Sequence, residues 1–134
     1  NSLIDESDLL IMNETELATL SGESPSGQLT STVLIKSLEK IALTSSQSVI
    51  VTLGSQGVFV YENKIGTLIP GLDVLPVDTT GSGDCFVGAL AAQYLVHGNL
   101  VDAAYFANKA AALSVTKKGA SASMPFLEEV VNFI

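Results

Sequence analysis

The chain is poor in the residues that mark several common classes of protein. Cys85 is its only cysteine, which excludes an internal disulfide and suits a reducing compartment, so we expect a cytoplasmic protein. His97, the only histidine, has no companion ligand or nearby nucleophile in the sequence and is interpreted as a helix-end residue. Lys and Arg number 6 against 14 Asp and Glu, and the net charge of −8 argues against a nucleic-acid partner. No apolar run reaches membrane-spanning length and no signal segment is evident, so no membrane partner is expected.

The composition favours one compact α/β domain. A chain of 134 residues suits a single domain with a real core. Hydrophobic residues make up 47% and charged residues only 15%, as is typical of strands buried on both faces by helices.

Hydrophobic patterning predicts four strands and several helices. Short apolar runs predict strands at 9–12, 49–53, 58–61 and 65–69, with a hairpin turn at Asn63-Lys64. Helical spacing predicts helices around 34–42, over 84–94 and 100–116, and from Pro125 to the end of the chain. Gly88 lies inside one of these helices, where glycine costs about 0.8–1.0 kcal/mol relative to alanine, so we expect a packing reason for it.

The segment around Gly81, Ser82 and Gly83 is the most informative part of the sequence. Three small residues leave almost bare backbone, whose amides can converge on one point together with the start of the following helix. That arrangement binds phosphate. Asp84 comes next, and a carboxylate beside a phosphate site makes sense as the base that deprotonates an attacking nucleophile. The alternative is structural: Asp84 is a helix N-cap after a glycine turn.

The segment Asp78-Thr79-Thr80-Gly81-Ser82-Gly83-Asp84, followed by Phe86, Gly88 and Ala89, resembles the C-terminal signature of the ribokinase-like (PfkB) family of sugar and nucleoside kinases. The family usually has alanine where this chain has Ser82, and a small serine leaves the backbone free. The resemblance implies transfer of the ATP γ-phosphate to a sugar hydroxyl, with the 5-hydroxyl of ribose as the leading acceptor and fructose or adenosine as alternatives. Asp84 would be the base, and the amides of Gly81, Ser82 and Gly83 would stabilise the transferring phosphoryl group.

Asn13 and Glu16 follow the first predicted strand. Their spacing predicts a capping box at the start of a helix. The family has an Asn-x-x-Glu motif at this point, so the resemblance also implies that both residues face the nucleotide phosphates and orient Mg²⁺, largely through water. The two roles are compatible.

Further nucleotide-site candidates follow the second strand and lie in the second long helix. The run Thr52-Leu53-Gly54-Ser55-x-Gly57 matches a family motif, which implies that Thr52, Gly54 and Gly57 lie near the nucleotide. This loop also comes after the carboxyl end of a strand, where open α/β sheets bind ligands. Asn108 corresponds to a family residue near the adenine, and its alternative interpretation is a solvent-exposed amide.

The segment Gly119-Ala120-x-x-Ser123-x-Pro125 resembles the ribokinase branch of the family. In that branch this loop packs beside the aspartate loop and encloses K⁺. The resemblance implies side-chain oxygens from Asp78 and Ser123, and backbone carbonyls from Thr80, Ser114, Lys117 and Gly119.

A kinase of this family is about twice as long as this chain. We therefore expect residues 1–134 to be the nucleotide-binding C-terminal half of a ribokinase-like three-layer α/β/α sandwich, which is Rossmann-like, with the N-terminal sugar-binding half and lid absent. The partners would be ATP, a small-molecule sugar and the missing half, and a homodimer of the full-length form is left open. The chain alone is expected to be inactive, and a catalytically silent nucleotide-binding module is the alternative.

Overall fold

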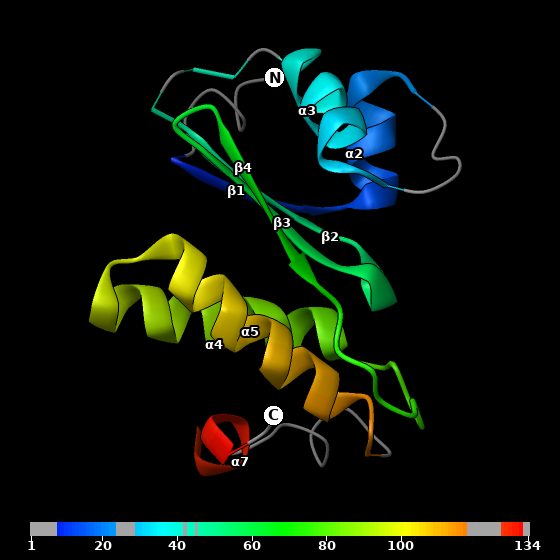
Figure 1. The fold of residues 1–134 in the computed structure, drawn as a ribbon, viewed down its shortest axis with the longest axis vertical. Coiled ribbons are helices and arrows are strands. Elements are labelled where there is room, and N and C mark those ends of the chain that lie inside the picture. The colour runs from blue at the N-terminus through cyan, green and yellow to red at the C-terminus, as the bar shows by residue number, and fades with distance from the viewer. Residues whose placement is uncertain (1–7, 24–28, 42, 45, 118–126, 133–134) are drawn as a thin grey trace. The chain divides into compact units, whose positions relative to one another are not determined.

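The computed structural model describes residues 8–23, 29–41, 43–44, 46–117 and 127–132 (Figure 1). The chain divides into two units, Asn1–Leu68 and Ile69–Ile134, and each is described by itself.

The first unit is built on a mixed sheet. Its strands are β1 (Leu9–Asn13), β2 (Ser48–Thr52), β3 (Gly57–Glu62) and β4 (Ile65–Pro70), in the order β1-β2-β3-β4, and β4 continues into the second unit. β1 and β2 are parallel, and β3 runs antiparallel to β2. The four predicted strands are thus present to within one or two residues, and the α/β class is confirmed.

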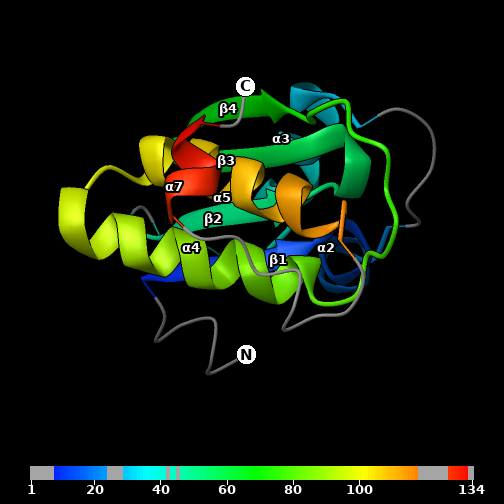
Figure 2. The ribbon, with the colours of Figure 1, turned by 90° about the horizontal axis from the view of Figure 1, so that it is seen from below.

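Two helices cover one face of this sheet (Figures 1 and 2). α2 (Glu14–Ser21) follows β1 directly, and α3 (Ser31–Glu39) precedes β2. Alternate residues of the strands point toward these helices, as the two-residue period of a strand requires. The resulting core consists of Met12, Leu17, Leu34, Leu38, Ile41, Val49, Val51, Leu53 and Phe59.

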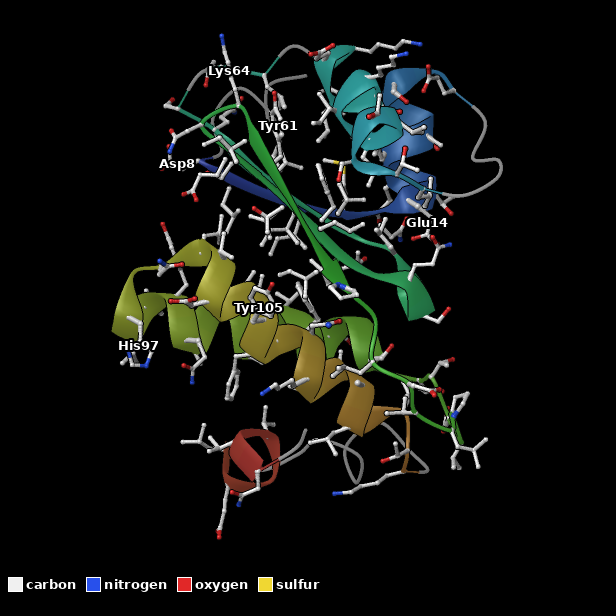
Figure 3. The ribbon with its side chains drawn as sticks, in the orientation of Figure 1. Asp8, Glu14, Tyr61, Lys64, His97 and Tyr105 are labelled. Carbon is white, nitrogen blue, oxygen red and sulfur yellow. The ribbon has the colours of Figure 1, made fainter. Side chains whose placement is uncertain are left out.

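The hairpin between β3 and β4 has a two-residue turn at Asn63 and Lys64. Both residues have positive φ, 52° and 63°, which is the geometry of a type I′ turn. Lys64 is exposed at this turn, as Figure 3 shows. The predicted turn is confirmed.

The second unit contains three helices within the described residues. They are α4 (Ser82–His97), α5 (Leu100–Ser114) and α7 (Leu127–Asn132). α4 packs on α5, and α5 contacts α7. A small core joins them through Cys85, Ala110 and Val130. None of the described helices has the length and apolarity needed to cross a membrane.

α4 begins at Ser82, two residues before the predicted start, and the interpretation of His97 as a helix-end residue is confirmed. It ends at the αL residue Gly98, whose amide donates to the carbonyl of Tyr94 over 2.8 Å. His97 therefore lies in the last turn, where Figure 3 shows it, and where a basic residue complements the helix dipole.

The surroundings of Gly88 differ from the expectation that this glycine allows close packing. It is exposed, and a Cβ built at its position meets no atom of the described residues within 4 Å. The predicted packing reason for this glycine is therefore wrong within this part of the chain, because helix periodicity places Gly88 on the exposed side of α4, with Asp84 and Ala91, and away from the buried Phe86 and Leu90.

We accordingly expect Gly88→Ala to raise the free energy of unfolding of the chain by about 0.5–1 kcal/mol. Alanine loses less backbone entropy than glycine on helix formation and meets no steric obstacle among the residues that the structure describes. Urea-induced unfolding followed by circular dichroism measures the change. A lower midpoint than that of the wild-type chain would contradict the expectation.

Candidate active site

In the first unit, the candidate residues meet at the carboxyl edge of the parallel strand pair. Asn13 ends β1 and is the register partner of Thr52, which ends β2. Open α/β sheets bind ligands beyond this edge. The pairing brings two predicted nucleotide-site residues side by side, although 38 positions separate them in the sequence.

The predicted capping box between Asn13 and Glu16 is confirmed. The Glu16 amide donates to Asn13 Oδ1 over 2.8 Å, and the Asn13 amide donates to Glu16 Oε2 over 2.9 Å. These reciprocal bonds satisfy two amides at the start of α2 and hold both side chains at the sheet edge. Glu16 is exposed there, so its carboxylate can also meet a hydrated cation.

The loop after β2 is a tight turn that leaves backbone accessible. Gly54 begins the 3₁₀ helix η1 (Gly54–Gln56), and the Leu53 amide donates to the Gly57 carbonyl over 2.9 Å. Gly54 is exposed with a φ of 58°, a conformation that disfavours side chains, and a Cβ placed there meets no atom of the described residues beyond its chain neighbours within 4 Å. A ligand could thus approach this backbone closely.

In the second unit, the predicted phosphate loop leads into α4. Gly81 is the N-cap, with a φ of 78°, and no side chain in the described part of the chain caps the helix. The Ser82 amide donates to the Thr79 carbonyl over 3.2 Å, and the Cys85 amide donates to the Gly81 carbonyl over 2.9 Å. Among the described residues, no acceptor is recorded for the amides of Gly83 and Asp84. An uncapped helix start with open amides suits an anion.

Asp84 lies at the third position of α4 and is exposed. The alternative that it is the N-cap is wrong, because Gly81 occupies that position and the helix has no side-chain cap. A carboxylate in the first turn still interacts favourably with the helix dipole, which is worth about 0.3–1 kcal/mol. This leaves the carboxylate available beside the open amides.

The loop that carries Asp78 lies against the segment that follows α5. The amides of Val77 and Asp78 both donate to the Val115 carbonyl, over 2.6 and 3.0 Å. Asp78 Oδ1 accepts a bond from the Thr80 amide over 2.9 Å. Asp78 and Thr80 are thus brought near the residues after Ser114.

The remaining potassium-site candidates are only partly described. The Ser114 carbonyl accepts a bond from the Lys117 amide over 3.4 Å. Gly119 and Ser123 lie outside the described residues. The sequence did not predict that the Val115 carbonyl accepts hydrogen bonds from Val77 and Asp78, because a contact through a backbone carbonyl does not depend on the side chain of the residue.

Asn108 is buried in α5, with 9% of its surface exposed, so the alternative of a solvent-exposed amide is wrong. Its Nδ2 donates to the Pro70 carbonyl over 3.1 Å and ties α5 to the end of β4. A role near the adenine stays a prediction.

Cys85 sits one residue after Asp84 but is buried. Burial raises the pKa of its thiol, because the charged thiolate loses hydration, and a hydrogen bond with Ser114 acts in the opposite direction. The thiol is therefore a poor nucleophile at neutral pH.

We expect iodoacetamide to alkylate Cys85 at pH 8 more slowly in the folded chain than in urea, by a factor on the order of ten or more. Because this is the only cysteine, intact mass against time measures the rate directly. Equal rates in the two conditions would show that the thiol is accessible and ionised.

The comparisons with known proteins indicate the same family as the signature segment around Gly81 and Asp84. Residues 1–127 match the model of the pfkB family of carbohydrate kinases, and the chain belongs to this family. It is 37% identical to a ribokinase of Staphylococcus aureus over 132 residues, which cover 97% of this chain and 42% of that protein. The chain thus spans about two fifths of the length of such a relative.

Two solved structures extend the comparison. A ribokinase of Arabidopsis thaliana complexed with ribose and ATP gives a TM-score of 0.80 at 32% identity, covering 96% of this chain and 41% of that one. A fructokinase of Vibrio cholerae with fructose, ADP and calcium ion gives 0.81 at 32% identity, covering 95% and 41%. A double mutant of that fructokinase, with fructose, ADP and potassium ion, gives 0.77 at 28% identity, covering 95% and 40%.

Proposed function

We propose that this chain is the nucleotide-binding portion of an ATP-dependent sugar kinase and that ribose is the phosphate acceptor. The observation that carries the proposal is the start of α4, where an uncapped helix presents open amides with the Asp84 carboxylate beside them. The amides would stabilise charge on the transferring phosphoryl group, and Asp84 would take the proton of the sugar hydroxyl.

Nucleotide binding would fall to the carboxyl edge of β1 and β2. Asn13, Thr52 and the exposed backbone at Gly54 offer hydrogen-bonding groups at this edge. Gly57 shapes the turn, and Asn108 is our candidate near the adenine. The described residues contain no cluster of three or more His, Cys, Asp or Glu side chains that could hold a metal ion. As the family motif at Asn13 and Glu16 implies, Mg²⁺ would be held by ATP phosphates and water near Glu16, and would neutralise phosphate charge.

The potassium proposal rests on Asp78. The amides of Val77 and Asp78 bond to the Val115 carbonyl, so the Asp78 loop lies next to the segment after α5. This contact supports the proposal that both segments supply ligands to one ion. Asp78 and Ser123 would give side-chain oxygens, and Thr80, Ser114, Lys117 and Gly119 would give carbonyls. Replacing Ser123 with alanine should weaken activation of the complete kinase by K⁺, measured as activity against K⁺ concentration. Unchanged K⁺ dependence would remove the site from the proposal.

Fructose is the second candidate acceptor, since the fructokinase of Vibrio cholerae is as similar in fold as the ribokinase. The test is an ATP-dependent phosphorylation assay on the complete polypeptide and on residues 1–134 alone, with ribose, fructose and adenosine. We expect phosphorylation of ribose by the complete form only. Activity on fructose or adenosine instead would keep the mechanism and replace the substrate, and no activity on any acceptor would favour a catalytically silent module.

A further inference from the structure

A hollow of about 370 Å³ lies on the first unit, away from the carboxyl edge of β1 and β2. Tyr61, which lines it, is the register partner of Val49 near the start of β2, whereas Thr52 ends that strand. Figure 3 shows Tyr61 and Lys64 at one end of the sheet and Glu14 at the other. We call this site the distal hollow and define it by the lining residues Leu38, Glu39, Ile41, Leu43, Tyr61 and Lys64.

The apolar part of the distal hollow is fixed by the core of the first unit. Leu38 and Ile41 belong to that buried core, and the Tyr61 ring packs against it. Gln47 also lines the hollow and is only 6% exposed. Its backbone amide donates to the Thr44 carbonyl over 3.2 Å, and its Oε1 accepts a bond from the Thr44 amide over 2.8 Å. The hollow is therefore formed before any ligand binds, as small-molecule sites usually are.

Two opposite charges lie beside this apolar surface. Glu39 is the last residue of α3 and Lys64 lies in the hairpin turn, and both are exposed. Among the described residues, no ion pair joins Glu39 to Lys64 and no hydrogen bond of either side chain is recorded. The hollow thus offers a carboxylate and an ammonium group that do not neutralise each other.

Lys64 occupies a backbone position that favours glycine. Its φ is 63°, and it is the second central residue of a type I′ turn, where Asn-Gly is the preferred pair. Lysine therefore gives no advantage to the turn itself. A role of its side chain in binding would account for a residue held in this uncommon conformation.

We infer that the distal hollow binds a free amino acid with an apolar side chain. Lys64 would pair with the α-carboxylate and Glu39 with the α-ammonium group, while the apolar side chain would cover Leu38 and the Tyr61 ring. A ligand with only negative charge would be repelled by Glu39 and by the net charge of −8. The volume is near the lower end of the range of ligand pockets, about 300–1,000 Å³, which suits a single amino acid.

The test is a titration of the ¹⁵N-labelled chain with L-leucine, followed by two-dimensional NMR. The amide shifts should saturate and should centre on Leu38, Tyr61 and Lys64. N-acetyl-L-leucine lacks the ammonium group and L-leucinamide lacks the carboxylate, so each should bind about tenfold more weakly. Glycine keeps both charges but has no side chain to bury, and it should also bind about tenfold more weakly.

Two variants test the assigned partners. Lys64→Gly should raise the Kd for L-leucine about tenfold, and Glu39→Gln should have a similar effect. Lys64→Gly gives the turn its preferred residue pair, so weaker binding would not be caused by loss of the fold, which circular dichroism checks. Lys36→Gln is the matched control, because Lys36 is exposed on α3 and does not line the hollow. It should bind L-leucine within about twofold of wild type.

Three results would overturn the inference. The first is the absence of saturable shifts with L-leucine, and the second is equal binding of L-leucine and glycine. The third is a Kd that Lys64→Gly leaves unchanged. Shifts centred on Asn13 and Gly54 would also overturn it, because they would place the amino acid at the carboxyl edge of the sheet. The proposed kinase activity enters none of these measurements, so its failure would leave this inference unaffected.

Discussion

Replacing Asp84 with asparagine in the complete kinase should lower kcat by about 10²–10⁴-fold, the usual contribution of a general base. Asparagine keeps the size of the side chain at the third position of α4 but cannot accept the proton of an attacking hydroxyl. The amides of Gly83 and Asp84 stay in place, so KM for ATP should change little. Steady-state kinetics with ATP and the sugar acceptor measure both constants.

The matched control for this substitution is Asp102→Asn. Asp102 is exposed and occupies the third position of α5, after the N-cap Asn99, just as Asp84 follows Gly81 in α4. Each change removes one charge and the same interaction with a helix dipole. Asp102→Asn should leave kcat within about twofold of wild type. Full activity of Asp84→Asn, or an equal loss in both variants, would assign Asp84 a structural role only.

Replacing Gly66 with alanine should lower the free energy of unfolding by about 1–3 kcal/mol, as overpacking of a core does. A Cβ at this position in β4 would lie 2.5 Å from Cζ and 2.9 Å from Cε2 of Phe59, and 3.3 Å from Cδ1 of Ile35. Phe59 is fully buried in the core of the first unit, so its ring has no free space to move into. Urea-induced unfolding of the chain measures the loss.

Two further variants separate this steric effect from the general effect of removing a glycine. Gly88→Ala changes the same atoms where no described neighbour is in reach and should have the opposite sign. Phe59→Leu lowers stability by itself, but it removes the ring atoms that the new Cβ would meet. Gly66→Ala should therefore lower the free energy of unfolding by less in the Phe59→Leu background. Additive losses in that double-mutant cycle would show that the two side chains do not interact.

Local patterns in the sequence determined much of the first unit. The capping box of Asn13 and Glu16 and the two-residue turn at Asn63-Lys64 involve residues at most three apart, so nearby residue types suffice to predict them. The strands were likewise predicted from short apolar runs. The phosphate loop was predicted from three small residues and a helical pattern, and the family signature indicated its role in a kinase.

Tertiary structure decided the features that depend on residues far apart. Strand register set Asn13 beside Thr52, and the Val115 carbonyl met the amides of Val77 and Asp78. Packing buried Asn108, whose amide bonds to the Pro70 carbonyl, and the orientation of α4 left Gly88 exposed. No local pattern encodes these pairings, because they arise only when elements pack and their backbone groups find distant partners. The sequence by itself thus determined the family and the local geometry of the candidate site, and packing decided which of its groups remain open to a ligand.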